Sequence, residues 1–155
     1  MAKMQALKYK DCGGSNSTVR VDHLDVEPSP LEVPGLLRII LRVNISTPPP
    51  DKVSVKLILR KRMAGSRWIR IPCIFGFGSC DYEHMPVCLL THELFECPVK
   101  AKYYSIDETY LLKSPETSLS QWLQRGDFQA LMKIFHEQTR SQLACLVAQF
   151  TIKMA

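Results

Sequence analysis

Hydrophobic and polar residues alternate with a period of two along most of the chain. In residues 36–46 the apolar side chains share one face of an extended backbone: Leu37, Ile39, Leu41, Val43 and Ile45. Residues 52–61 repeat this pattern with Val53, Val55, Leu57 and Leu59. Such alternation is typical of an antiparallel strand that packs on a core with one face and meets water with the other.

Further strands are predicted at 17–26, 67–71, 99–112, 127–137 and 143–154. A change of face near His23 predicts a β-bulge, and a turn or bulge is expected near Asp107. Connections rich in Pro, Gly and Ser separate the strands at 27–35, 46–52, 63–67 and 113–126, of which only the last is expected to hold a helical turn. Seven or eight short strands predict an all-β antiparallel sandwich or cup. We expect a single domain over 1–155, with a flexible N-terminus over 1–11.

Charge and composition narrow the partners. The chain has 155 residues and a formal net charge of +5 with its histidines neutral, and protonation of all four histidines would raise this to about +9. A basic surface favours an anionic membrane surface, more so at acidic pH. The expected docking face is the segment 56–70, whose basic residues would lie near the headgroups: Lys56, Arg60, Lys61, Arg62, Arg67 and Arg70. Nucleic acid is not expected, because no nucleic-acid-binding motif accompanies the scattered basic residues. The longest apolar runs are too short for a transmembrane helix.

Cysteines and glycosylation sequons indicate an oxidising compartment. Six cysteines permit a complete set of three disulfides, and Asn16-Ser17-Thr18 and Asn44-Ile45-Ser46 are both sequons. We therefore expect a secreted protein or one of the lysosomal lumen, glycosylated at Asn16 and Asn44. The N-terminus lacks the apolar region of a secretory signal peptide, so we expect that a signal has been removed.

Motifs for catalysis are weak. Residues 91–95, THELF, lack the second histidine of a zinc-protease helix, and no Gly-x-Ser-x-Gly is present. Asp81 and Glu83 would share a face in a strand, as a carboxylate pair or, more simply, as a solvated strand edge. We expect no catalytic residues, no metal and no cofactor.

The segment IPCIFGFGSC, residues 71–80, holds two cysteines whose spacing fits neither a zinc knuckle nor a redox pair. A local disulfide fits better, with Phe75 and Phe77 either contacting lipid or capping the core. Trp68 and Trp122 lie in or beside connections, where a tryptophan is either a core plug or part of a lipid-facing rim.

At this point the residues resemble a known family. The run Ala64-Gly65, Trp68-Ile69-Arg70-Ile71-Pro72-Cys73 and Gly78-Ser79-Cys80 with Glu83-His84 is similar to the ganglioside GM2 activator family, of the lipid-recognition (ML) class. Trp122, Leu123 and Gly126 match a later segment of that family. The resemblance implies a β-cup with an internal hydrophobic lipid cavity and the disulfides Cys12–Cys145, Cys73–Cys80 and Cys88–Cys97. The 88–97 segment is shorter than in the family, and one family disulfide is absent.

The resemblance implies a non-enzymatic protein that extracts a glycosphingolipid (ganglioside) or phospholipid and presents it to a lysosomal β-hexosaminidase. The alternative is a secreted carrier of a lipidic or semiochemical ligand. Strand periodicity and the resemblance together select nine cavity-lining residues: Leu37, Ile39, Leu41, Val55, Leu57, Leu59, Met132, Ile134 and Ile152. The pattern alone fits a filled core equally well. The expected membrane-contacting rim consists of Trp68, Ile69, Phe75, Phe77, Trp122 and Leu123.

Overall fold

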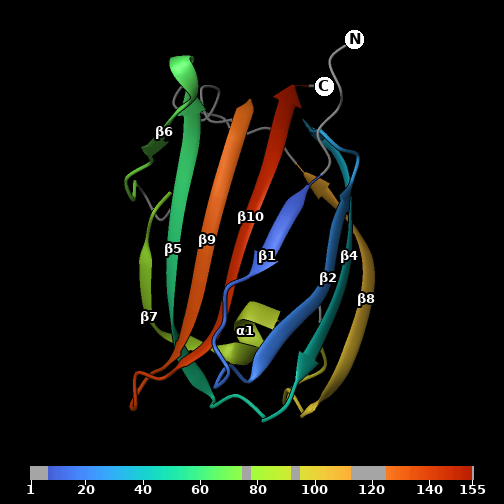
Figure 1. Cartoon of the computed structure of the whole chain (residues 1–155). Helices are drawn as coiled ribbons and strands as arrows, with labels where there is room; N and C mark the ends of the chain where they lie inside the picture. The colour runs from blue at the N-terminus through green and yellow to red at the C-terminus, as the bar shows by residue number, and fades with distance from the viewer. Residues whose placement is uncertain (1–6, 75–77, 92–94, 113–124, 155) are drawn as a thin grey trace.

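A computed structural model describes residues 7–74, 78–91, 95–112 and 125–154, which form two stacked sheets (Figure 1). The seven-stranded sheet has the order β1 (Lys8–Asp11), β10 (Gln142–Met154), β9 (Gly126–His136), β5 (Lys52–Met63) and β6 (Arg67–Arg70), with β3 (Leu31–Val33) beside β10 and β7 (Asp81–Pro86) beside β5. The three-stranded sheet has the order β2 (Val19–Glu27), β4 (Gly35–Ile45) and β8 (Lys102–Leu112). The strands pair antiparallel, except that β3 lies parallel to β10.

The predicted all-β antiparallel sandwich is confirmed, and the pairing shows where the sequence pattern failed. The register of β2 on β4 shifts between Val21 and His23, which confirms the predicted bulge. The expected irregularity near Asp107 is wrong, because β4 and β8 pair without interruption from Gly35–Leu112 to Ile45–Lys102. The expected flexibility of 1–11 is wrong for residues 8–11, which pair with β10.

Two short helical segments and two strands complete the description. A 3-10 turn at Ala64–Ser66 occupies the predicted turn at 63–67. The helix α1 (Val87–Thr91) was not predicted, since a helical turn was expected only at 113–126, most of which lies outside the described residues. The short strand β3 falls inside the predicted loop at 27–35, and β7 follows the Cys73–Cys80 loop.

The two ends of the sandwich differ. At one end, α1 lies between the sheets (Figure 1); we call this the α1 end. At the opposite end, here called the distal end, β4 and β9 begin and β5, β8 and β10 finish. The two largest buried clusters are centred on Val43 and Ile45 in the small sheet and on Val53 and Val55 in the large sheet, and Val87 of α1 packs against both. The two largest clusters of the core therefore meet at the α1 end.

All six cysteines are paired as the resemblance implied: Cys12–Cys145, Cys73–Cys80 and Cys88–Cys97. The first bridge closes most of the chain and ties the end of β1 to β10, where the Cys12 amide also donates a hydrogen bond to the Cys145 carbonyl at 3.0 Å. The other two bridges close short loops. The three disulfides add covalent ties to a sandwich whose two clusters meet through α1.

Candidate functional site

The inner faces of the two sheets carry the predicted lining residues. Strand register places Val55 opposite Ile134 and Leu57 opposite Met132 on one face of the large sheet. On the facing sheet, alternation along β4 brings Leu37, Ile39 and Leu41 to the same side as the buried Val43 and Ile45. All nine predicted lining residues therefore lie on strands of the two facing sheets, and we call the space that they border the intersheet site.

On β4 and β5, burial of the inward side chains falls from the α1 end toward the middle of the strand. On β5, Val53 is 1% exposed and Val55 is 8% exposed, whereas Leu57 and Leu59 on the same face are only half-buried. On β4, Val43 and Ile45 are buried, whereas the other inward side chains, Leu37, Ile39 and Leu41, are half-buried. In a tightly packed sandwich the middle of each inner face is buried. Apart from the buried Val55, the predicted lining residues therefore stay partly uncovered.

Unequal sheets explain this exposure. Neighbouring strands lie about 4.8 Å apart, so five strands abreast span roughly 19 Å between outer axes, whereas three span roughly 10 Å. The path β1-β10-β9-β5-β6 is five strands wide, and β2-β4-β8 is three wide. The small sheet is too narrow to cover the whole apolar face of the large one. A third buried cluster covers part of the inner face of the large sheet near the distal end. In it the rings of Phe128 and Phe150 stack with their centroids 5.8 Å apart.

Lys61 lies on the inner face of the large sheet. The prediction that it lies beside the membrane headgroups, with the other basic residues of 56–70, is therefore wrong. Lys61 pairs with Phe128 in the register, is 8% exposed, and places its Nζ 5.8 Å from the Phe128 ring. Desolvation, aided by the charge of Arg125, lowers the pKa of Lys61 below its usual range. The period of two had signalled this position, because Lys61 continues the series Val53 to Leu59.

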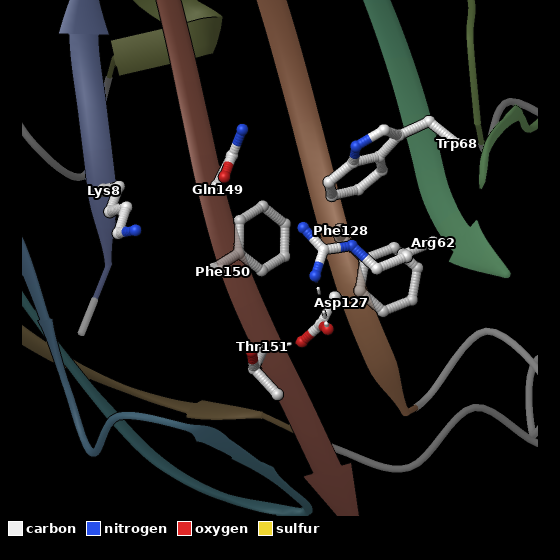
Figure 2. Close-up of a pocket in the computed structure, with 8 residues that line it drawn as sticks. All are labelled: Lys8, Arg62, Trp68, Asp127, Phe128, Gln149, Phe150 and Thr151. Carbon is white, nitrogen blue, oxygen red and sulfur yellow. Dashed lines mark hydrogen bonds and ion pairs between the residues drawn. The ribbon is translucent and has the colours of Figure 1, made fainter. Parts of the chain in front are cut away.

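Trp68 lies on the outer face of the large sheet near the distal end, half-buried and stacked on Arg62 (Figure 2). The guanidinium carbon of Arg62 is 4.8 Å from the Trp68 ring centroid, and Arg62 Nη1 is 3.7 Å from Asp127 Oδ2. A small notch beside this pair is bordered by Lys8, Gln149 and other residues shown in Figure 2. Trp68 therefore packs on a polar face rather than plugging the core.

The other predicted rim residues have mixed outcomes. Ile69 is 40% exposed and pairs with Lys61 at the edge of the large sheet. Phe75, Phe77, Trp122 and Leu123 lie outside the described residues. The base of the Cys73–Cys80 loop is fixed to β5, because Ser79 Oγ bonds both the amide and the carbonyl of Leu59, at 2.9 Å and 3.2 Å. This loop base thus lies at the edge of the intersheet site.

Both members of the candidate carboxylate pair, Asp81 and Glu83, are exposed on β7, and Glu83 is ion-paired. Glu83 accepts a hydrogen bond from Ser54 Oγ at 2.5 Å and pairs with Arg140 at 3.4 Å. The Ser54 hydrogen bond and the charge of Arg140 hold the pKa of Glu83 below its usual range. A lowered pKa keeps this carboxylate ionised near neutral pH, which is the form that pairs with Arg140. Within the described ranges no group of three or more His, Cys, Asp or Glu could hold a metal ion, and no helix is long and apolar enough to span a bilayer.

Both sequons lie at the α1 end. Asn16 and Asn44 are exposed, and the amide of Ser46 donates to the carbonyl of Thr18 at 2.9 Å, which holds the two sequons together. Asn44 points to the outer face of the small sheet, because it alternates with the inward Val43 and Ile45. Glycans at these positions would leave the distal end free.

Comparisons with known proteins agree with this architecture. No family model matches the chain. The ganglioside GM2 activator of Mus musculus is 27% identical over 143 residues, covering 83% of this chain and 73% of the mouse protein. The ganglioside GM2 activator of Macaca fascicularis is also 27% identical over 143 residues, covering 83% and 74%. A Niemann-Pick type C2 protein from Japanese carpenter ant superposes with a TM-score of 0.51 at 10% identity, covering 94% of this chain and 99% of that chain. The chain is thus a distant homologue of the first two and has the fold of the third.

Proposed function

We propose that this distant relative of the ganglioside GM2 activators binds the hydrocarbon part of a lipid in the intersheet site and carries it between membranes, without catalysing a reaction. The observation that carries the proposal is the half-burial of Leu37, Ile39, Leu57 and Leu59 on two facing apolar surfaces. Each methylene moved from water into such a site contributes about 0.8 kcal/mol, so an acyl chain supplies a large driving force.

The name shared by the two curated relatives supports a finer proposal. The name ganglioside GM2 activator supports a glycosphingolipid ligand. The family resemblance of the sequence adds a phospholipid as the wider class and presentation of the lipid to a lysosomal β-hexosaminidase. Three disulfides and two exposed sequons support a secreted or lysosomal protein. The predicted internal cavity, its lining and its rim belong to this proposal.

Docking on an anionic membrane is supported by five basic side chains of β5 and β6, the two strands that hold Arg62 and Trp68. Lys56, Arg67 and Arg70 are exposed, and Arg60 and Arg62 are half-buried. Their field reaches about 8 Å at physiological ionic strength, so it acts only on close approach. Each Lys or Arg near an anionic bilayer contributes about 1 kcal/mol to the free energy of binding, so a few of them are enough for weak, reversible docking.

The test is lipid analysis of the purified protein. Native mass spectrometry should show a one-to-one complex with a lipid after incubation with vesicles, and the extracted lipid should be a glycosphingolipid or phospholipid. Transfer of a fluorescent lipid between donor and acceptor vesicles should require the protein. A bound volatile or fatty ligand would instead support a secreted carrier. Turnover of the lipid without any partner protein would overturn the non-enzymatic proposal, and absence of any bound lipid would overturn lipid binding itself.

A further inference from the structure

Two leucines lie side by side on the outer face of the small sheet with their side chains in water. Leu36 of β4 and Leu111 of β8 are direct register partners. Each is 64% exposed, the largest value among the exposed large hydrophobic side chains of the described residues. Single exposed leucines are ordinary on a protein surface, but a paired set on adjacent strands is a contiguous apolar patch. No motif of the sequence includes either residue.

The pair is confined to the distal end. In the next outward row, Arg38 bonds Asp107 at 2.6 Å and 2.8 Å and Glu27 at 3.2 Å. Farther along β4 lies Asn44, eight residues from Leu36 and therefore about 26 Å away at the usual rise of a strand. The outer face thus runs from an apolar tip, through an ion-paired band, to a glycosylation sequon at the α1 end. Such a polarity gradient suits a molecule that approaches an apolar phase with its distal end.

We propose that Leu36 and Leu111 form a membrane contact on the small sheet, across the intersheet site from Trp68 and Ile69 of the large sheet. The inference rests on the proposed function, since it places the half-buried lining residues against the bilayer between two contacts. The occupant is a lipid surface, because the pair lies at the distal end and both sequons lie at the α1 end, where glycans would face water.

The geometry also limits the depth of insertion. Rows of outward side chains are two residues apart, so the Arg38 row follows the leucines by about 7 Å. Amphipathic elements lie about 5–10 Å deep at the boundary of headgroups and acyl chains. The leucines therefore reach the upper acyl region while Arg38 and its two carboxylate partners stay among the headgroups.

The experiment compares the double variant Leu36→Ser with Leu111→Ser against Tyr103→Ser. Tyr103 is a matched control, because it is 52% exposed on the same face of β8 but at the α1 end. Flotation with vesicles of phosphatidylcholine and phosphatidylserine should show binding weakened about ten- to hundred-fold in the double variant, since two apolar side chains no longer enter the interface. Tyr103→Ser should change binding less than about two-fold. Leu111→Phe, which keeps the apolar surface, should retain wild-type binding.

A second measurement separates this proposal from the proposed function. Binding of a dispersed short-chain fluorescent phosphatidylcholine, in the absence of vesicles, should be unchanged in the double variant. If the wild-type protein binds no dispersed lipid while vesicle binding still depends on the leucines, the proposed function fails and the membrane contact stands. Vesicle binding unchanged by the double substitution would overturn the contact. Unchanged vesicle binding together with loss of a concentration-dependent dimer would assign the pair to a second copy of the chain instead.

Discussion

Replacing Leu57 with phenylalanine tests whether the intersheet site is an open space or a filled core. Leu57 and Val53 lie on the same face of β5, four residues apart. Val53 is 1% exposed inside a cluster with Val55 and Leu143, whereas Leu57 is half-buried. The substitution Val53→Phe is therefore the matched control, with the same new side chain on the same strand face in a closed environment.

The expected costs differ because Leu57 is half-buried whereas Val53 is fully buried. Inserting extra carbon atoms into a packed core usually costs about 1–3 kcal/mol, and Val53→Phe should reach or exceed the upper value. At Leu57 the ring enters the space between the sheets, so the free energy of unfolding should fall by less than about 1 kcal/mol. The same ring should displace one or two methylenes of a bound acyl chain, at about 0.8 kcal/mol each, which weakens lipid binding roughly 4- to 15-fold.

Urea unfolding with the disulfides intact measures the free energy of unfolding, and displacement of a fluorescent lipid measures the lipid affinity. The change in lipid affinity is compared with the change in the free energy of unfolding, because a general loss of folding would lower both quantities together. A cost at Leu57 as large as that at Val53, with lipid affinity unchanged, would refute an open intersheet site and leave a filled core in its place.

Three further predictions concern covalent ties, pH and docking. The double substitution Cys12→Ser with Cys145→Ser opens a bridge with a sequence separation of 133, and in the loop-entropy model it should lower the free energy of unfolding by about 5 kcal/mol, measured by urea unfolding. The pKa of Glu83 is lower in the folded state than in the unfolded state, so its ionised form stabilises the fold above the unfolded pKa. This stabilisation is lost as the pH falls through the lower folded pKa, and the thermal unfolding midpoint should therefore drop below about pH 4.5. The substitution Glu83→Gln should make that drop smaller. Trp68→Ala, which removes a stack on Arg62 rather than a core contact, should leave near-UV circular dichroism intact but weaken binding to anionic vesicles, with little salt dependence on neutral ones; a collapsed spectrum would show a core role instead.

Long alternating segments predicted the strands well because one buried face fixes the register of a strand. The predicted 36–46 and 127–137 became β4 and β9 within one residue at each end. Short elements were missed because their stability comes from tertiary contacts. The strand β1 has only four residues and pairs with β10 beside the Cys12–Cys145 bridge. The five-residue α1 is too short to show a helical period, and it lies between the sheets where Val87 packs on both clusters.

The functional residues divided along a different line. Alternation identified which side chains face inward, but a period of two is the same for a filled core and for a cavity wall, so Leu57 and Val53 were indistinguishable until their exposure was known. Lys61 was assigned to the surface by its charge, although its position in the alternation placed it on the apolar face. Leu36 is the reverse case, because it is an apolar residue on the outward, polar face of β4. The alternation pattern therefore did not select it as a functional residue.

The unequal widths of the two sheets offer a physical reason for the half-burial of the inner-face side chains that no single residue supplies. Two sheets of equal width can cover each other, and their inward side chains then interlock at the density of a crystal. Here the three-stranded sheet faces a path five strands wide, and α1 adds cover at only one end. Aromatic side chains would fill more of the region between the sheets, yet four of its half-buried positions hold leucine, isoleucine or methionine: Leu37, Ile39, Leu57 and Met132. Medium-sized, flexible apolar side chains leave room for a guest and adapt to its shape. A hydrocarbon chain would complete a core that the described part of this protein leaves unfinished, and binding and added stability should therefore rise together with ligand concentration.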